Sequence, residues 1–143
     1  MKSKRIDEPG EQTYVLVFET GDEVPEGLLQ FAKQERLAAS RLSGIGGFSE
    51  VTLGYFDIEK KKYLPIPVRE QVEVLSLAGN ISLYEDQPRV HAHVVVGKSD
   101  GTAHGGHLLA AKVRPTLEVV LVESPKRLER AADARFGLPL IRL

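Results

Sequence analysis

The sequence contains no cysteine, which excludes a disulfide scaffold and any metal site built on thiolates. Histidine is therefore the strongest nitrogen or sulfur ligand that the chain can offer a metal ion. No apolar run approaches the roughly 20 residues that a membrane span needs. The polar start, Met1 to Gly10, has no hydrophobic region of the kind found in a secretory signal. We therefore expect a cytoplasmic protein with no membrane partner.

The sequence also lacks an excess of charge of either sign. Its 19 basic and 20 acidic residues give a formal net charge of −1. A domain that holds DNA by itself normally neutralises several phosphates with a basic face. The densest basic run, Lys60-Lys61-Lys62, is typical of a solvated hairpin tip. The charge therefore argues against tight DNA binding by this chain alone, although weak, salt-sensitive contacts through Lys2–Arg5 and Lys60–Lys62 are compatible with it.

The length and composition indicate a single globular unit. The chain has 143 residues, 42% of them hydrophobic and 27% charged, and it contains no repeat, linker or low-complexity block. We expect a flexible arm over residues 1–10 and one domain over residues 11–143.

The hydrophobic patterning predicts many strands and two helices. A long helix is expected over residues 24–40, because Pro25 suits its first turn and Leu28, Phe31 and Ala32 follow the helical period. Ser124-Pro125 indicates a short second helix over residues 125–133. Strands are predicted over residues 13–19, 50–57, 63–68, 72–77, 80–84, 89–97, 106–113, 117–122 and 138–143. The fold class is α+β, a mainly antiparallel β-sheet packed against one long helix plus a short C-terminal helix.

Two glycine-containing segments interrupt these strands. Gly44-Ile45-Gly46-Gly47 lacks the pattern of a phosphate-binding loop, so we expect a bulge or a close strand crossing there. Ala78-Gly79 is interpreted as a tight reversal or a bulge.

All four histidines fall between residues 91 and 107. Side chains of a strand alternate between its faces, so His91 and His93 are expected to point together. Asp100-Gly101 marks a turn, after which the chain can return antiparallel and bring His107 beside that pair. Three neutral imidazoles that converge on one point suit Zn²⁺ or a similar divalent ion and leave one coordination position open.

Other interpretations of these histidines stay open. Histidines on a strand are often half-exposed residues without a ligand. Gly105-Gly106 lacks side chains where a close backbone approach would be useful, which favours an ordered site. The segment contains no carboxylate, so it is not the H-E-x-x-H signature of a hydrolase.

A set of short stretches forms one pattern across most of the chain. They are Gly46-Gly47-Phe48 with Val51–Asp57, Gly79–Ser82, Pro88–Gly97, Asp100-Gly101 with Gly105–Leu108, and Val113 with Thr116–Val119. This pattern, between about Thr13 and Val122, resembles the plants-and-prokaryotes conserved domain, called PPC or PCC and also DUF296. The histidine segment is its most specific part.

The resemblance implies an α+β fold and a homotrimer. Some bacterial members look like metal-site proteins, with ligands that match His91, His93 and His107. Glu118 belongs to the pattern and is our candidate for orienting a ligand histidine or a bound water. His104 lies outside the pattern and is an extra ligand, a proton carrier or an exposed residue, of which exposure is favoured. Plant members grip DNA with an Arg-Gly-Arg-Pro element, which this sequence lacks.

Two functions from different classes follow. The first is a homotrimeric metal- and ligand-binding or regulatory module of the PPC type, whose small-molecule ligand is unknown. The alternative is a zinc-dependent enzyme that acts on a small molecule through a metal-bound water. Such an enzyme needs a general acid or base, and Glu118, His104 and Glu73 are the available candidates. Catalytic residues are therefore not assigned.

Overall fold

The computed structural model describes residues 1–5 and 10–143, with the side chains of residues 3–5 outside the description. The helix of the described chain is α1 (Val24–Gln34). The strands are β1 (Lys2–Arg5), β2 (Gln12–Glu19), β3 (Ala39–Asp57), β4 (Lys62–Val68), β5 (Val72–Tyr84), β6 (Gln87–Gly97), β7 (Ala103–Glu123), β8 (Glu129–Asp133) and β9 (Leu138–Arg142). The arm predicted over residues 1–10 falls partly outside the described residues.

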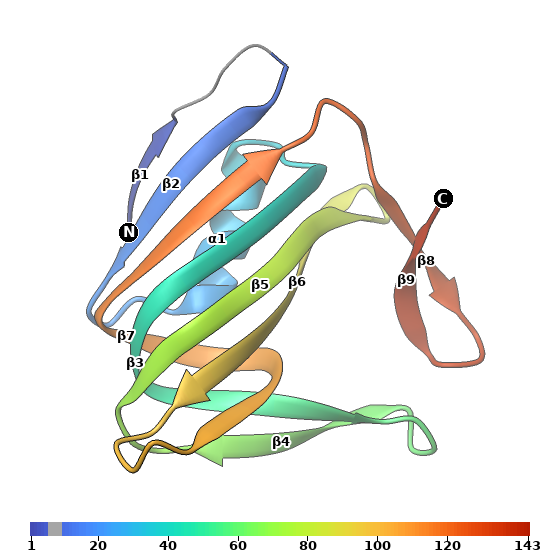
Figure 1. Ribbon diagram of the computed structural model, residues 1–143. Coiled ribbons are helices and arrows are strands. Elements are labelled where there is room, and N and C mark those ends of the chain that lie inside the picture. Colours follow the sequence, from blue (N-terminus) through green and yellow to red (C-terminus); the bar gives the residue numbers. More distant parts are fainter. Residues whose placement is uncertain (6–9) are drawn as a thin grey trace.

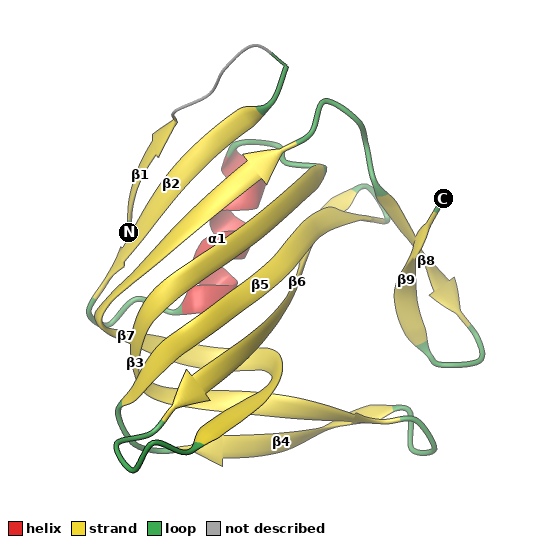
Figure 2. Ribbon diagram, in the orientation of Figure 1, coloured by secondary structure: helices red, strands yellow, loops and turns green. Residues whose placement is uncertain are grey.

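These strands form one sheet of mostly antiparallel strands, as expected. Its order is β1-β2-β7-β3-β5-β8-β9, with β4 paired to β3 and β6 paired to both β5 and β7. A single parallel pair, Leu83 with Glu129, joins β5 to β8. Because β3, β5, β6 and β7 pair with one another in a closed circuit, the sheet curls, and α1 packs against one of its faces (Figures 1 and 2).

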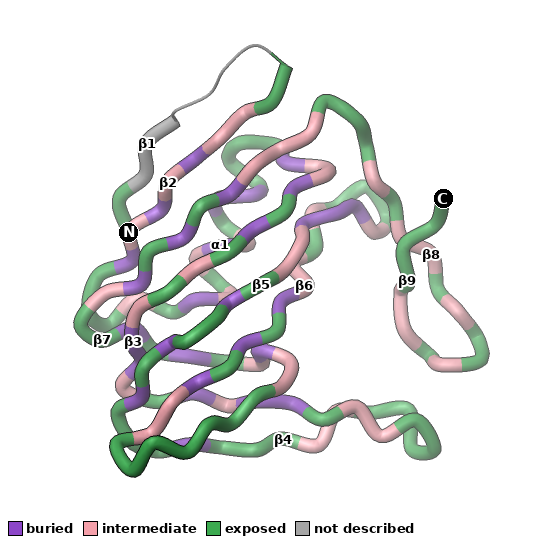
Figure 3. Tube along the Cα trace, viewed as in Figure 1, coloured by how far each residue is buried: buried purple, intermediate pink, exposed green. Residues whose placement is uncertain are grey.

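The hydrophobic core lies between α1 and this face of the sheet. Leu28 and Phe31 of the helix are buried with Leu16, Phe18 and Leu121 of β2 and β7. Along the strands, buried and exposed residues alternate over long stretches (Figure 3). This alternation leaves the other face of the sheet available for polar side chains, including the histidines.

The helix is shorter than the sequence predicts. It ends at Gln34, not at residue 40, because Arg36 adopts a left-handed conformation with φ 55°. The Leu37 N–H then donates to the Ala32 carbonyl at 2.9 Å, which closes the helix end in the manner of a Schellman motif. Glycine usually marks such an end, so an arginine at this position gave no signal in the sequence.

The predicted C-terminal helix over residues 125–133 is also wrong. The chain bends at residues 125–126, and Leu128 then accepts a backbone hydrogen bond from Leu83 and donates one to Ala38. Residues 129–133 then form β8, which pairs with β9. Leu138–Arg142 forms a strand as expected. The structure of residues 125–133 therefore depends on hydrogen bonds to residues far away in the sequence. A local helix pattern contains no information about such partners.

The interrupted strands are longer than expected. The β3–β4 hairpin lies where residues 50–57 and 63–68 predict it. The bulge expected near Gly46 is present, and a Cβ atom there would lie 2.3 Å from the Thr116 carbonyl oxygen, so β3 and β7 cross closely. Ala78-Gly79 makes no reversal, because β5 runs through it and is irregular between Val74 and Ser76 instead. In the described residues, no helix is long and apolar enough to cross a membrane.

Candidate metal centre

The three predicted ligand residues lie on two paired strands. His91 and His93 alternate with the buried Ala92 and Val94 on β6, so both point away from the core. His93 lies directly opposite His107 of β7. The turn between these strands is the expected one at Asp100-Gly101, where the Asp100 carboxylate accepts the Thr102 backbone N–H at 2.9 Å. The hairpin therefore places the three side chains on one face.

The three imidazole rings converge. Their centroids are 5.2–5.4 Å apart, and one ligand nitrogen from each ring lies within 4.8 Å of the other two. Nitrogens bound to one tetrahedral Zn²⁺ at about 2.0–2.1 Å would be roughly 3.4 Å apart. Small rotations of the imidazole rings would shorten the distances between the nitrogens to this value. The His93 side chain is exposed, so its ring has room to rotate. Three imidazoles without a thiolate or carboxylate fit zinc or a similar ion and leave a position for an outside ligand.

Burial favours the neutral form that binds a metal. Desolvation, together with Arg130, His93 and Arg89, lowers the pKa of His91 below its ordinary value. Desolvation and the neighbouring His91 and His93 lower the pKa of His107 to about 4. At neutral pH both imidazoles are therefore uncharged, and protons do not compete with a metal for their nitrogens.

Tyr63 of β4 supports His107 from the side. Its ring stacks on the imidazole with a centroid distance of 4.4 Å, and its hydroxyl lies 3.4 Å from His107 Nδ1. Phe56 packs edge-on against the same tyrosine at 5.1 Å. Burial raises the pKa of Tyr63, so the phenol keeps its proton and can hydrogen-bond the imidazole.

Arg130 of β8 lies on the other side of the cluster, beside His91. Its Nη2 is 3.5 Å from His91 Nδ1 and 2.7 Å from Asn80 Oδ1. Nε donates to Ser82 Oγ at 2.7 Å, and Nη1 donates to the Pro139 carbonyl at 2.9 Å. These bonds fix the guanidinium over the outer face of β5 and β6.

The other predicted site residues lie elsewhere. His104 is exposed, as favoured, and its position on β7 directs it to the opposite face from His107. Glu73 is exposed and pairs with Gly97. Glu118 pairs with Ile45, far along β3 from the Gly54 that faces His107. Within one chain, the structure does not bring these three residues to the histidines.

Sequence reasoning missed Tyr63, Arg89 and Arg130. Arg89 had a signal, because it lies two residues before His91 on the same strand face. Tyr63 and Arg130 had no such signal in the sequence. Tyr63 reaches the histidines through the β3–β4 hairpin, and Arg130 reaches them through β8, which was predicted as a helix.

The curled antiparallel sheet with three histidines on its outer face defines the class: a small β-rich domain with a candidate metal centre. Residues 6–125 match the Plants and Prokaryotes Conserved (PCC) domain. The chain belongs to this family, which confirms the resemblance read from the sequence.

Solved structures agree with this assignment. A PPC protein from Pyrococcus horikoshii has a TM-score of 0.86 at 33% identity, with 99% of this chain and 95% of that chain covered. A metal-containing protein from Archaeoglobus fulgidus has a TM-score of 0.82 at 36% identity, covering 90% of this chain and 91% of that one. A candidate DNA-binding protein from Bacteroides thetaiotaomicron has a TM-score of 0.88 at 29% identity, covering 98% and 96%.

A curated relative is much longer than this chain. The bifunctional protein GlmU from Synechococcus sp. (strain JA-3-3Ab) is 34% identical over 129 residues. This match takes in 88% of the chain but 20% of that protein. The chain therefore spans about a fifth of the curated relative.

Proposed function

We propose that this protein is a metal- and ligand-binding or regulatory module that holds Zn²⁺ or a similar divalent ion through His91, His93 and His107. The observation that carries the proposal is the convergence of three imidazole nitrogens within 4.8 Å. The lowered pKa values of His91 and His107 support it, because they keep these ligands neutral. So does the likeness to a metal-containing protein from Archaeoglobus fulgidus.

A bound ion would supply a Lewis-acidic centre with an open coordination position. The chain's own residues would orient the ligands and shape the space around that position. Tyr63 holds the His107 ring by stacking, and Arg130 lies against His91. The alternative, a zinc-dependent enzyme, has weaker support. Its three acid–base candidates lie away from the histidines, and the described residues that line the adjoining pocket include no carboxylate.

We also propose that the protein forms a homotrimer through the open face of the sheet. Ile45, Leu75, Val95 and Val120 are 61%, 54%, 41% and 45% exposed, although they are large apolar side chains. Three of them line one shallow groove together with Glu118. Such a surface favours contact with another subunit. We place Glu118 at this contact between copies.

We do not expect this chain alone to bind DNA tightly. Of the basic run, Lys60 pairs with Asp57 at 3.0 Å, and Lys61 donates to the Ala134 carbonyl at 2.9 Å. The net charge of −1 leaves little to attract a polyanion.

Metal analysis of protein prepared without a histidine tag tests the metal proposal. We expect about one divalent ion per chain in the wild type and its loss in His91→Ala and His107→Ala. His104→Ala is the matched control, because it removes an exposed histidine of the same hairpin and should keep the metal. A wild-type protein that stays metal-free after zinc addition, or a His107→Ala variant that keeps its metal, would contradict the proposal.

A further inference from the structure

A small pocket adjoins the histidines. Strands β4, β6 and β7 form one side of it, and the β8–β9 hairpin forms the other. Its volume is about 80 Å³, whereas pockets for drug-sized ligands measure roughly 300–1,000 Å³. The pocket therefore admits a group of only a few heavy atoms. Its wall includes His91, His107 and two arginines, Arg89 and Arg130.

Arg130 carries a charge that no acid balances within the described residues. Its partners are a hydroxyl, an amide oxygen, a carbonyl and, at 3.5 Å, the imidazole of His91, all of them neutral. A guanidinium has five N–H donors. Nη2 also lies 3.5 Å from His91 Nδ1, so within the described structure the donor without a partner is on Nη1. Charged side chains are almost never fully buried without a partner, because desolvation of an unbalanced charge is costly. Arg130 is partly buried and carries part of this cost. An anion beside Arg130 would supply the missing charge.

Arg89 adds a second positive charge on the same side. It lies two residues before His91 on β6, so it shares the outer face with the histidines. Its guanidinium carbon is 5.8 Å from the centre of the Tyr84 ring, a cation–π contact. None of the ion pairs in the described structure involves Arg89, so its charge has no acid partner there. Its positive charge acts on His91, His107 and Arg130. Two cations and two potential metal ligands thus form the polar part of the pocket wall, while Val90, Leu138 and Leu140 form apolar parts.

We propose that this pocket binds a small oxyanion, a carboxylate or phosphate group, and that Arg89 and Arg130 hold its negative charge beside the histidines. A guanidinium presents parallel N–H donors that match the paired oxygens of both groups. This inference rests on the proposed function, because one oxygen of the anion would take the open position of the metal. The arginines would decide the charge of the ligand, and the pocket would limit its size.

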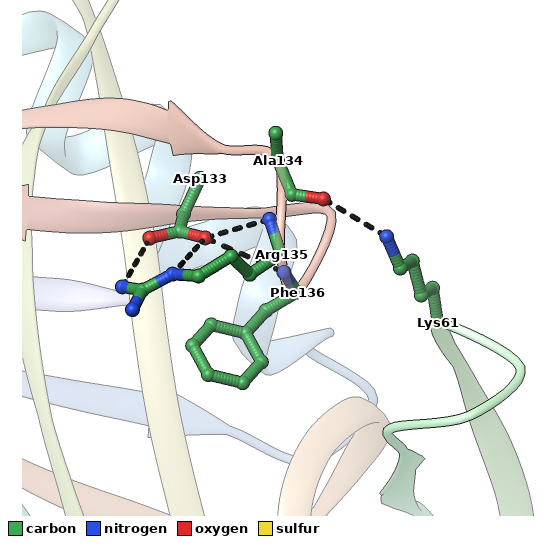
Figure 4. Close-up of polar contacts among 5 residues, drawn as sticks. All are labelled: Lys61, Asp133, Ala134, Arg135 and Phe136. Atoms are coloured by element: carbon green, nitrogen blue, oxygen red, sulfur yellow. Dashed lines mark hydrogen bonds and ion pairs between the residues drawn. The ribbon is translucent and has the colours of Figure 1, made fainter.

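The β8–β9 hairpin positions this charge. Arg130 anchors the hairpin near its base, and Lys61 of the β3–β4 hairpin donates to the Ala134 carbonyl at its tip (Figure 4). Within the tip, the Asp133 carboxylate binds Arg135 at 2.9 Å and accepts the Arg135 backbone N–H at 2.8 Å. The hairpin lies beyond residue 125, where the match to the family domain ends. The anion site thus combines strands inside that match with a hairpin outside it.

Calorimetric titration of the zinc-loaded protein tests the inference. The probes are acetate, inorganic phosphate and acetamide, of which acetamide is a neutral analogue of acetate. We expect acetate or phosphate to bind at least about ten-fold more tightly than acetamide, since charge-assisted hydrogen bonds are the stronger ones. The two anions distinguish a carboxylate ligand from a phosphate ligand.

The arginines are tested in Arg89→Gln and Arg130→Gln, with Arg127→Gln as the matched control. Arg127 is an exposed arginine near the hairpin and pairs with Asp86 at 2.9 Å. We expect about ten-fold weaker anion binding in the first two variants and no change in the control. Should Arg130→Gln fail to fold, Arg89→Gln decides, because the Arg89 side chain is exposed and makes no hydrogen bond within the described chain.

The outcomes separate the two proposals. Zinc-loaded protein that binds acetate and acetamide alike, that binds no anion, or that binds anions equally well in Arg89→Gln overturns the inference and leaves the metal centre intact. Wild-type protein that takes up no metal overturns the proposed function instead. Zinc content is therefore measured in every variant before titration.

Discussion

The carboxylate of Glu123 is expected to hold the link between α1 and β3. It accepts the backbone N–H of Ala38 at 2.8 Å and that of Ala39 at 3.1 Å, and it also accepts the Ser40 hydroxyl. These contacts hold the first residues of β3 against β7, a few residues after the end of α1. Glu123→Ala removes both acceptor oxygens and leaves two backbone N–H donors and the hydroxyl of the buried Ser40 without a partner.

The expected cost follows from these bonds. A hydrogen bond to a charged group contributes about 1.5–3 kcal/mol, and bonds to one carboxylate are not additive. Partial burial lets water replace some of them. We therefore expect Glu123→Ala to lower the free energy of unfolding by about 2–4 kcal/mol. With a urea m-value of about 2 kcal/mol/M, the midpoint falls by about 1–2 M.

Urea denaturation followed by far-ultraviolet circular dichroism, at fixed protein concentration, measures this shift. Glu73→Ala is the control, because Glu73 is exposed on β5 and surface substitutions usually stay within about 0.5 kcal/mol. Ser40→Ala and the double variant complete a mutant cycle, in which we expect a coupling of about 1 kcal/mol or more. The reasoning would be refuted if Glu123→Ala lowered the free energy of unfolding no more than Glu73→Ala does, or if the Glu123 and Ser40 substitutions showed no coupling.

Three further predictions concern the open sheet face, the strand crossing and the histidines. If the protein forms the proposed trimer, Ile45→Asp should turn it into monomers in light scattering, while Ile58→Asp, at a residue 62% exposed in the β3–β4 loop, should not. A monomeric wild type would contradict the proposed trimer. Gly46→Ala should lower the free energy of unfolding by about 1–3 kcal/mol, because its Cβ would meet the Thr116 carbonyl at 2.3 Å; an unchanged urea midpoint would count against the close crossing. In metal-free protein, nuclear magnetic resonance should show His107 staying neutral as the pH falls below 6.5 and becoming charged near its pKa of about 4; titration close to 6.5 would exclude the burial described.

The sequence by itself determined the local features of the histidine site. The i, i+2 spacing of His91 and His93 fixes their common face, because a strand alternates its side chains whatever its neighbours are. The turn at Asp100-Gly101 then returns the chain at a length that places His107 opposite His93. The β3–β4 hairpin follows from the same kind of local signal. These features need only short-range geometry, so they can be predicted from sequence.

Tertiary structure alone decided where α1 ends, that the segment over residues 125–133 is not a helix, and what surrounds the histidines. Arg36 closes α1 in a conformation that glycine usually signals, and the segment after Pro125 extends because Leu128 bonds to Ala38 and Leu83. Arg130 reaches His91 only after that segment has joined the sheet. A hydrogen bond between residues far apart along the chain leaves no periodic trace in either segment. The candidate ligand residues were therefore visible in the sequence, whereas the charged pocket beside them became visible only in the fold.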